Sequence, residues 1–287
     1  MMNWISKNNI LIVGLGLMGG SVAKGLKRLG FHIEAIDNRQ SAIDFAEENG
    51  IIDKGYAYPD ETAIRKADVM IFALYPEVFK EWVAAQQHLF KYGLLITDVT
   101  GVKNCVVYDI QAMLRDDVEY VPAHPMAGRE VYGVENADDS IFRGANFIVA
   151  PTDKNTPEGI EWCKGLGKIL GFRKISVLTP EEHDEMIGFV SQLTHVIAVS
   201  LMTCNDNTHL VDYTGDSFRD LTRIASINED MWSELFLLNK DHLLRHMDSF
   251  ISEMAQFREL LAADDREGLK DKMRLSTERH SYFLAKK

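Results

Sequence analysis

The sequence predicts an α/β protein in which a mainly parallel sheet is followed by an all-helical part. Before residue 178, short apolar β-branched runs alternate with amphipathic stretches of helical length. Buried parallel strands covered by helices on both faces have this order. After Thr179-Pro180 the chain shows only long helical periodicity. We therefore expect two domains, residues 1–178 and residues 179–287.

Each predicted element follows from a local pattern. Strands are expected at Ile10–Val13, His32–Ile36, Val69–Leu74, Leu94–Val99, Glu119–Pro122, Asn146–Ala150 and Lys174–Leu178. Helices between them are expected at Ser21–Leu29, Ser41–Asn49, Val102–Met113 and Thr156–Leu170. The helical part begins at Pro180, because proline fits a first helical turn and Glu181 and Glu182 would face the positive end of the helix dipole.

The composition argues against several classes of protein. A formal net charge of −12 disfavours nucleic acid and anionic membranes as partners. The three cysteines are widely spaced, with no Cys/His cluster, which favours a reducing compartment and no metal site. The run before Asn9 leaves no room for a signal peptide, and the apolar stretch Ile187–Met202 is expected to be too short and too polar to span a bilayer. The expected location is the cytoplasm.

A glycine motif follows the first predicted strand and opens a helix. In the pattern GxGxxG, Gly14 permits a tight turn, Gly16 allows the backbone to approach a pyrophosphate, and Gly19 allows close packing of helix on strand. The alternative is a glycine-rich turn in an unrelated α/β protein. We expect a Rossmann-type domain whose turn contacts a dinucleotide through Gly14, Leu15, Gly16, Leu17, Met18 and Gly19.

Asp37 bears on the identity of the dinucleotide. It ends the second predicted strand, 18 residues beyond Gly19, where an acid binds the ribose 2′-hydroxyl. A carboxylate there would repel a 2′-phosphate, which favours NAD over NADP. Arg39 could accept such a phosphate and so points the other way. The predicted cofactor is NAD, with Asp37 and Arg39 in its site.

His124 is the histidine best placed for catalysis. It follows the fifth predicted strand in the run Val121–Gly128, at the carboxyl end of the sheet, where open α/β folds bind ligands. Flanking prolines would hold this loop stiff. An imidazole titrates near neutrality and is a suitable base for a hydroxyl proton. The alternative is a structural histidine in a proline-rich loop.

A polar stripe marks the first helix of the second domain. Asp184, Gly188, Ser191 and His195 have spacings of four, three and four residues, so a regular helix would place them on one face. Such a stripe either faces water or lines a cleft. We expect Ser191 and His195 in a substrate cleft, and His183 at the surface.

A heptad-like seam runs along the helix expected near residue 250. Its members are Leu243, Met247, Phe250, Met254, Phe257 and Leu261. Alternating spacings of four and three are typical of a helix that packs on a partner helix. The pattern alone leaves open whether that partner belongs to the same chain or to a second copy.

Five segments in this order resemble the prephenate/arogenate dehydrogenase family. They are Gly14–Gly19, Thr97–Lys103, His124–Gly128, Ser191–His195 and Phe218–Ser226. The resemblance covers nearly the whole chain, and its specific parts are the His-Pro-Met-Ala-Gly and Phe-Arg-Asp-Leu-Thr-Arg-Ile runs.

The resemblance implies an enzyme that oxidises and decarboxylates prephenate or arogenate with NAD, and a helical domain that forms an intertwined homodimer. It implies that His124 takes the ring hydroxyl proton and that Arg223 binds a substrate carboxylate. Arg219, one turn earlier, would bind a second carboxylate or pair with a nearby aspartate. Many relatives carry a serine where Gly101 stands, so Thr100 would supply that hydroxyl or His124 would work without it.

Two other functions share some of these features. A β-hydroxyacid dehydrogenase combines similar domains but relies on a lysine in the helical domain, and none lies near the polar stripe of 180–205. A non-catalytic NAD-sensing module would need neither His124 nor Arg223. Prephenate is the preferred substrate. The residues do not distinguish it from arogenate, nor do they settle inhibition by tyrosine.

Overall fold

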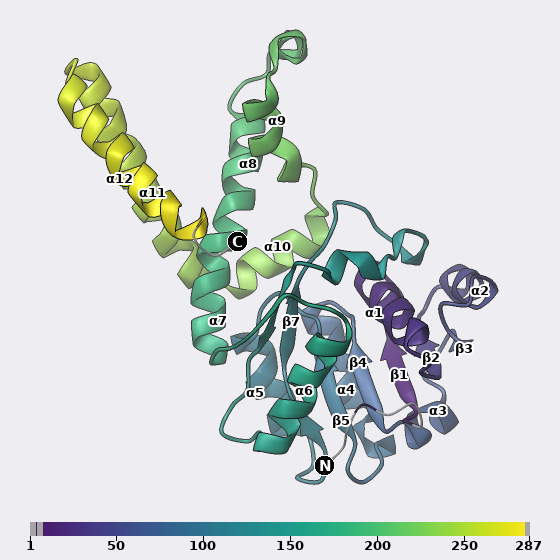
Figure 1. Cartoon of the computed structure of the whole chain (residues 1–287). Coiled ribbons are helices and arrows are strands. Elements are labelled where there is room, and N and C mark those ends of the chain that lie inside the picture. Colours follow the sequence, from purple (N-terminus) through teal and green to yellow (C-terminus); the bar gives the residue numbers. More distant parts are fainter. Residues whose placement is uncertain (1–3, 5–7, 285–287) are drawn as a thin grey trace. The chain divides into compact units, whose positions relative to one another are not determined.

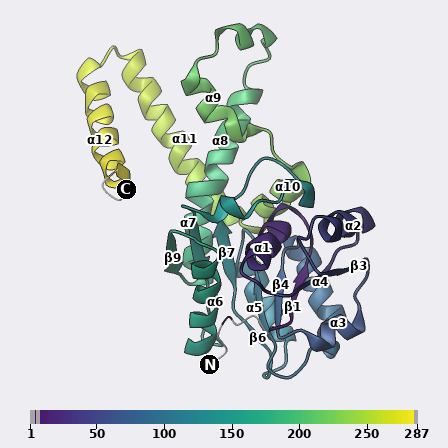
Figure 2. The same cartoon turned by 45° about the vertical axis from the view of Figure 1, so that its right-hand side comes forward.

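The computed structural model describes residue 4 and residues 8–284, and its chain divides into two compact units. The first unit is Met1–Asn239 and the second is Lys240–Lys287. Figures 1 and 2 show the elements of both units in two views.

Six parallel strands form the main sheet of the first unit, in the order β3-β2-β1-β4-β5-β6. Their bounds are β1 (Ile10–Val13), β2 (Ile33–Ile36), β3 (Lys54–Tyr56), β4 (Val69–Phe72), β5 (Leu95–Asp98) and β6 (Glu119–Tyr120). The strand order reverses between β1 and β4, and open α/β sheets bind ligands outside the carboxyl ends of such a pair.

Helices cover both faces of this sheet. They are α1 (Leu17–Arg28), α2 (Gln40–Glu48), α3 (Glu61–Lys66), α4 (Pro76–Gln86) with η1 (Gln87–Leu89), and α5 (Asn104–Met113). Ile10 and Ile12 of β1 belong to one apolar cluster, whereas Leu11 and Val13 belong to another. Alternate side chains are therefore buried on opposite faces, which confirms the predicted parallel sheet with two covered faces.

A second sheet of three strands carries the predicted catalytic histidine. It contains β7 (Ala123–Met126), β8 (Asn146–Val149) and β9 (Lys174–Val177). The elements η2 (Val134–Asn136), η3 (Asp139–Phe142) and α6 (Pro157–Ile169) connect them. His124 lies opposite Ile148 in the antiparallel β7–β8 pair, so the expectation of a loop there is wrong. Two prolines around a histidine hid this short strand from the sequence pattern.

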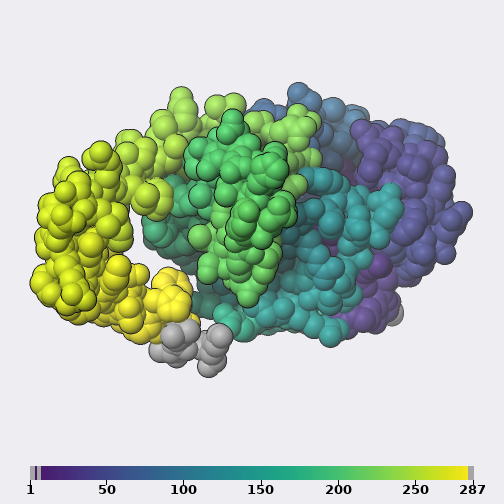
Figure 3. All heavy atoms as spheres, turned by 90° about the horizontal axis from the view of Figure 1, so that it is seen from above, coloured from purple at the N-terminus to yellow at the C-terminus, as the bar shows by residue number. Residues whose placement is uncertain are grey.

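One long helix follows the second sheet in the first unit. It runs from Pro180 to Thr203 through α7 (Pro180–Ile187), the π-helical η4 (Gly188–Leu193) and α8 (Thr194–Thr203). Its start has a capping box, in which Thr179 Oγ1 accepts from the Glu182 N–H and Glu182 accepts from the Thr179 N–H. The elements η5 (Thr208–Tyr213), α9 (Asp216–Thr222), η6 (Arg223–Ala225) and α10 (Glu229–Leu238) follow. Figure 3 shows residues of the η5–α9 stretch, in green, at the surface.

The helix 180–203 is long and apolar enough to cross a membrane, by length and composition only. The expectation that this stretch is too short and too polar is therefore wrong, because the helix begins before the apolar run. Its buried face nevertheless carries His183, Asp184 and Gln192, and each of these is hydrogen-bonded to groups of the same chain. Satisfied polar groups of this kind indicate a face packed against protein.

The second unit is a helical hairpin. Helix α11 (Lys240–Ala262) and helix α12 (Arg266–Leu284) are joined by a turn in which Asp264 has a φ of 54°. An ion pair of 2.6 Å between Lys272 and Glu253 links the two helices. Along the predicted seam of α11, Met254 and Leu261 remain 58% and 56% exposed. The hairpin therefore leaves much of this apolar seam uncovered.

Candidate active site

The glycine turn has the geometry that a bound pyrophosphate requires. Gly14 has a φ of +98°, and a Cβ there would lie 2.4 Å from the Ala73 carbonyl oxygen. A Cβ at Gly19 would lie 1.9 Å from the Gly14 carbonyl oxygen. Gly16, in contrast, faces open space and begins α1 with no side chain capping its N-terminus. The free N–H groups of this helix end can bind phosphate oxygens.

Asp37 is bonded to this turn. Its Oδ2 accepts from the Leu15 N–H over 2.7 Å and its Oδ1 accepts from the Arg39 N–H over 2.9 Å. The Arg39 guanidinium donates to the Leu15 carbonyl over 3.2 Å and remains about half exposed. Leu17 and Met18, at the start of α1, are partly exposed. The cofactor residues predicted from the sequence therefore lie together around one turn, and they fit an adenosine ribose and a pyrophosphate.

His124 is linked to two further polar residues. Its Nδ1 lies 2.8 Å from Nε2 of His183, and Nδ1 of His183 lies 2.7 Å from Oδ1 of Asp184. A carboxylate only accepts, so the Nδ1 of His183 carries the proton. The Nε2 of neutral His183 is then an acceptor, and the Nδ1 of His124 donates to it. The second nitrogen of His124, Nε2, then has no proton and keeps a free lone pair.

Both imidazoles are held in the neutral form. Burial lowers the pKa of His124 well below its usual range, and the neighbouring His183 and Lys103 lower it further. Burial also lowers the pKa of His183, although the hydrogen bond to Asp184 acts in the opposite direction. A neutral His124 with a free Nε2 can accept a proton, which is the property required of a general base.

Asp184 does not line an open cleft, contrary to the expected polar stripe. It is buried, and its carboxylate accepts from the backbone N–H groups of Lys103 and Asn104, both over 2.8 Å. These groups belong to the first turn of α5, so Asp184 caps that helix. The expectation that His183 lies at the surface is also wrong, since its side chain is fully buried.

Gly101 borders His124. A Cβ at Gly101 would lie 3.9 Å from Cε1 of His124 and 3.5 Å from a methyl group of Leu235. The Thr100 hydroxyl is directed elsewhere: it is buried, bonded to Asp98, and 2.9 Å from the ammonium of Lys103. This geometry does not support a direct contact between that hydroxyl and a substrate.

The π-helical segment orients His195. Its Nδ1 lies 2.9 Å from the Ser191 carbonyl, which can only accept, so Nδ1 carries the proton. The imidazole also packs against Trp232 of α10, with 3.7 Å between ring centroids and 30° between the ring planes. Burial lowers its pKa, while the Ser191 carbonyl acts in the opposite direction. His195 is therefore a neutral imidazole with Nε2 as an acceptor, beside the partly exposed Ser191.

The two predicted arginines have different partners. Arg223 donates to Oε1 of Glu130 over 2.7 Å and is 66% exposed. Arg219 pairs with Asp216 over 2.5 Å and donates to the Thr214 carbonyl. The local pairing considered for Arg219 is therefore the one present. Arg223 is bound to a residue that follows β7, and both Arg223 and Glu130 affect the pKa of His195.

Two models of one family match the chain. The nucleotide-binding domain of prephenate dehydrogenase matches residues 22–176, and the dimerization domain of the same enzyme matches residues 179–275. The prephenate dehydrogenase of Bacillus subtilis is 32% identical over 271 residues, which cover 92% of this chain and 72% of that protein. The chain belongs to the prephenate dehydrogenase family. Family membership and the nucleotide-binding domain make it an NAD-dependent dehydrogenase.

Other relatives agree with this assignment. The cyclohexadienyl dehydrogenase of Zymomonas mobilis is 29% identical over 266 residues, covering 90% of this chain and 89% of that protein. A crystal structure of a prephenate dehydrogenase from A. aeolicus, in complex with hydroxyphenyl propionate and NAD+, superposes with a TM-score of 0.88 at 29% identity. The superposition covers 98% of this chain and all of that one. A 3-hydroxyisobutyrate dehydrogenase from Mycobacterium tuberculosis, with a TM-score of 0.52 and 16% identity, shares the fold alone.

In this member of the prephenate dehydrogenase family, sequence reasoning missed several polar residues around the base. His183, Gln192 and Asn239 are buried, and the side-chain amide of Asn239 donates to the Asp184 carbonyl and to Gln192. The adjacent pair His183-Asp184 directly after a capping box was the available signal. No signal predicted the π segment, which changes the helical register between Asp184 and His195.

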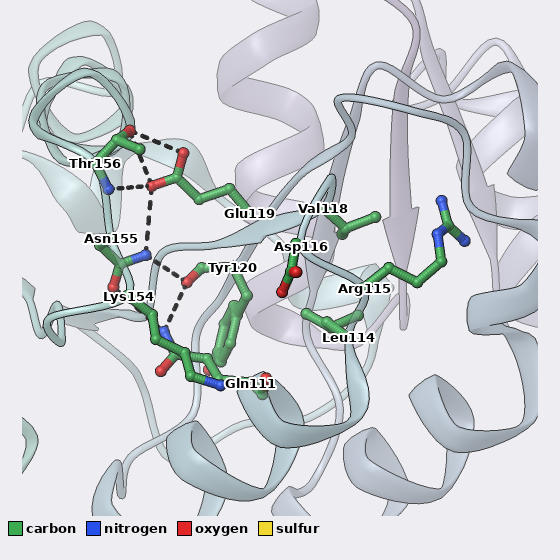
Figure 4. A pocket seen from close by; sticks show the side chains of 10 residues that line it. All are labelled: Gln111, Leu114, Arg115, Asp116, Val118, Glu119, Tyr120, Lys154, Asn155 and Thr156. Carbon is green, nitrogen blue, oxygen red and sulfur yellow. Dashed lines mark hydrogen bonds between the residues drawn. The ribbon is translucent and has the colours of Figure 1, made fainter.

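A hollow in the surface of this family member lies at the end of α5. It is lined by Gln111, Leu114, Arg115, Asp116, Val118, Glu119, Tyr120, Lys154, Asn155 and Thr156 (Figure 4). Glu119 bonds to the backbone N–H and the hydroxyl of Thr156, the residue that caps α6. The hollow thus contains an occupied helix cap. None of its lining residues is one of those predicted for cofactor, base or substrate.

Proposed function

We propose that this chain oxidises and decarboxylates prephenate to 4-hydroxyphenylpyruvate, with reduction of NAD, on the route to tyrosine. The observation that supports this most is the hydrogen-bonded row Asp184–His183–His124, which leaves Nε2 of His124 free to accept a proton beside Gly101. A dehydrogenase acting on an alcohol needs such a base close to the hydride acceptor.

His124 is proposed to carry the proton of the reaction. The ring hydroxyl donates to Nε2 of His124. Its proton moves to that nitrogen as the hydride leaves the ring carbon that carries the hydroxyl. The bond to the ring carboxylate then breaks, CO2 leaves, and its electron pair completes the aromatic ring. The proton can return to the phenolate oxygen of the product. When bound, NAD supplies the acceptor for the hydride.

The substrate's anionic end is proposed to bind near Arg223 and His195. A guanidinium can bind a carboxylate through two parallel hydrogen bonds. Glu130 holds Arg223 at 2.7 Å, so a substrate carboxylate would have to replace that partner. His195, fixed through Ser191 and Trp232, is proposed to border the same end, where its Nε2 would accept from water and not bond directly to a keto or carboxylate oxygen, since these oxygens also only accept. Ser191 is proposed to border the same side chain of the substrate.

Arogenate, with an ammonium in place of the keto group, is the second candidate substrate. The acceptor nitrogen of His195 suits that ammonium, whereas the names of the relatives from Bacillus subtilis and Lactococcus lactis favour prephenate. Initial rates of the purified protein, measured with each substrate and with each of NAD and NADP, decide among the four pairs. We expect prephenate with NAD to have the highest kcat/KM.

The base assignment has its own test. In His124→Asn, kcat should fall by roughly two or more orders of magnitude, while the Kd for NAD should stay unchanged, because the residue is not part of the nucleotide turn. A normal turnover in this variant would reject His124 as the base. An absence of turnover with every substrate, alongside tight NAD binding, would favour the NAD-sensing module instead.

We also infer that the chain is a cytoplasmic homodimer with a nucleotide-binding domain 1–178 and a substrate-binding and dimerisation domain 179–287. The exposed seam of α11 and the match of 179–275 to a dimerization domain support the dimer. Three free cysteines, Cys105, Cys163 and Cys204, suit a reducing compartment. Light scattering during size-exclusion chromatography would test the dimer, for which twice the mass of one chain is expected. Met254→Glu should shift the measured mass toward that of a single chain.

A further inference from the structure

Asp98 and Lys103 form a buried ion pair beside the base. The Nζ of Lys103 lies 2.5 Å from Oδ2 of Asp98, and neither side chain is exposed to solvent. Burying two charges costs free energy that the pair regains only when its geometry is good and its other hydrogen-bonding groups are satisfied. The buried ion pair lies at the carboxyl end of β5, next to the candidate active site. The reaction described above does not use it.

The carboxylate of Asp98 joins the loop after β5 to the start of β7. On one side, Oδ2 accepts from the Thr100 N–H and from Lys103. On the other side, Oδ1 accepts from the Tyr120 hydroxyl over 2.9 Å and from the Ala123 N–H over 3.1 Å. Ala123 directly precedes His124 in β7. Asp98 therefore determines where the backbone of the base stands relative to the loop that contains Gly101.

Lys103 continues the same network in the other direction. Its backbone N–H donates to Oδ1 of Asp184 over 2.8 Å, and the same oxygen accepts from His183, which orients His124. The side chain of Lys103 thus holds the backbone next to His124 through Asp98. The backbone N–H of Lys103 holds the imidazole of His124 through Asp184 and His183. The contacts form a closed ring that begins and ends at His124.

We propose that Lys103 and Asp98 are positioning residues for His124. The ring of contacts fixes the direction of Nε2 toward the substrate by holding both the backbone and the imidazole of His124. This rests on the function proposed above. The ring joins β5, α5, β7 and α7, so a shift of any one of them changes the place of the base. The charged or titratable groups that act on His124 within it are His183 of α7 and Lys103 at the start of α5, and Asp184 acts through His183.

Variants that remove the charges separate positioning from folding. Lys103→Met keeps all but the last atom of the side chain's length but leaves Asp98 buried without its counter-charge, which threatens the fold. The double variant Asp98→Asn/Lys103→Met removes both charges, and the asparagine oxygen can still accept from Ala123. Lys91→Met is the control, since Lys91 pairs with Asp68 at the opposite end of the same sheet.

The first measurement is steady-state turnover by the full-length protein. In the double variant we expect kcat to fall about tenfold or more, with the KM and the Kd for NAD within about twofold, because a base displaced by a fraction of an ångström loses rate and not ligand affinity. The control should keep the kcat of the unaltered protein. A folded double variant with unaltered kcat would overturn the proposal.

The second measurement needs no substrate. Nitrogen-15 NMR of the histidine rings reports which nitrogen carries the proton, and His124→Asn identifies the signal of the base. We expect one neutral tautomer of His124, protonated on Nδ1, in the unaltered protein. In the double variant His183 still selects that tautomer, so we expect a changed chemical shift of Nε2 as the ring moves. Equal spectra in the two would also overturn the proposal. If the unaltered protein oxidises no prephenate, the proposed function fails, and the spectra still decide whether the ring orients His124.

Discussion

Arg223 and Glu130 form an ion pair of 2.7 Å, although 93 positions separate them in the chain. Arg223 is 66% exposed and Glu130 is 35% exposed, so the pair contributes little to stability. It joins the short η6 turn to the segment that follows β7. The guanidinium is therefore held near the end of β7 by a partner that an anionic ligand can replace.

Arg223→Ala should raise the KM for prephenate by roughly 30-fold or more, since a charge-assisted bidentate pair is worth about 2–4 kcal/mol. The kcat should change less, because the base and the nucleotide turn are untouched. Arg219→Ala is the control, as its partner is Asp216, and its KM should stay within about twofold. Equal KM values for Arg223→Ala and the unaltered enzyme would exclude the carboxylate contact.

His183→Leu should lower kcat by roughly 10- to 100-fold, because His124 loses the acceptor that selects its tautomer. Asp184 keeps its two backbone donors in this variant, so the α5 cap should survive. His88→Leu, at an exposed histidine, should leave kcat unchanged. Steady-state assays with saturating NAD provide the measurement, and a His183→Leu enzyme of full speed would contradict the relay.

Gly101 and Gly14 should respond in opposite ways to an added side chain. At Gly101 a Cβ makes only ordinary contacts of 3.5–3.9 Å, so Gly101→Ser should fold normally and bring a hydroxyl close to His124. Its kcat should equal or exceed that of the unaltered enzyme.

Gly14→Ala would place a Cβ 2.4 Å from a carbonyl oxygen at a φ of +98°, and NAD binding should be lost. Thermal unfolding and NAD titration check both, and a disrupted Gly101→Ser fold would show that the site is tighter than these contacts indicate.

Stability should fall as the pH falls below about 6.5. His124 and His183 have lower pKa values in the folded chain than the ordinary value of about 6.5 expected when unfolded. Below that pH the unfolded chain therefore binds more protons, and each group removes at most about 1.4 kcal/mol of stability per pH unit. Urea unfolding at pH 7.5 and 5.5 measures the drop. His183→Leu should show a smaller drop than the unaltered protein, and an equal one would contradict the assignment.

The parts predicted from the sequence are those whose cause is local. The strand Ile10–Val13 and the glycine turn after it carry their own hydrophobic run and steric requirements, and the structure has that strand at those residues. The capping box at Thr179 is likewise contained within four residues. The second sheet was missed because β7 is short and contains Pro125, and because β8 and β9 look like further members of the main sheet.

The surroundings of the base could not be predicted, because they depend on partners far apart in the chain. His183 is buried only because β7 and the start of α5 lie against α7, about 60 and 80 residues away in sequence. The π segment Gly188–Leu193 then rotates His195 relative to Asp184, so a regular 3.6-residue period placed both on one face wrongly.

The antiparallel pairing of β7 with β8 makes the part of the candidate site that carries His124 stiffer than the part that carries Arg223. His124 lies on an edge strand that pairs with β8 and is held to Asp98 through the Ala123 N–H, whereas Arg223 lies on a three-residue turn and is exposed. Under the proposed function, proton transfer would belong to the part on β7, and recognition of the substrate's variable side chain to the exposed turn of Arg223. This turn is called the compliant half. Mutations that exchange a keto acid for an amino acid as preferred substrate should therefore accumulate in the compliant half without slowing the chemistry.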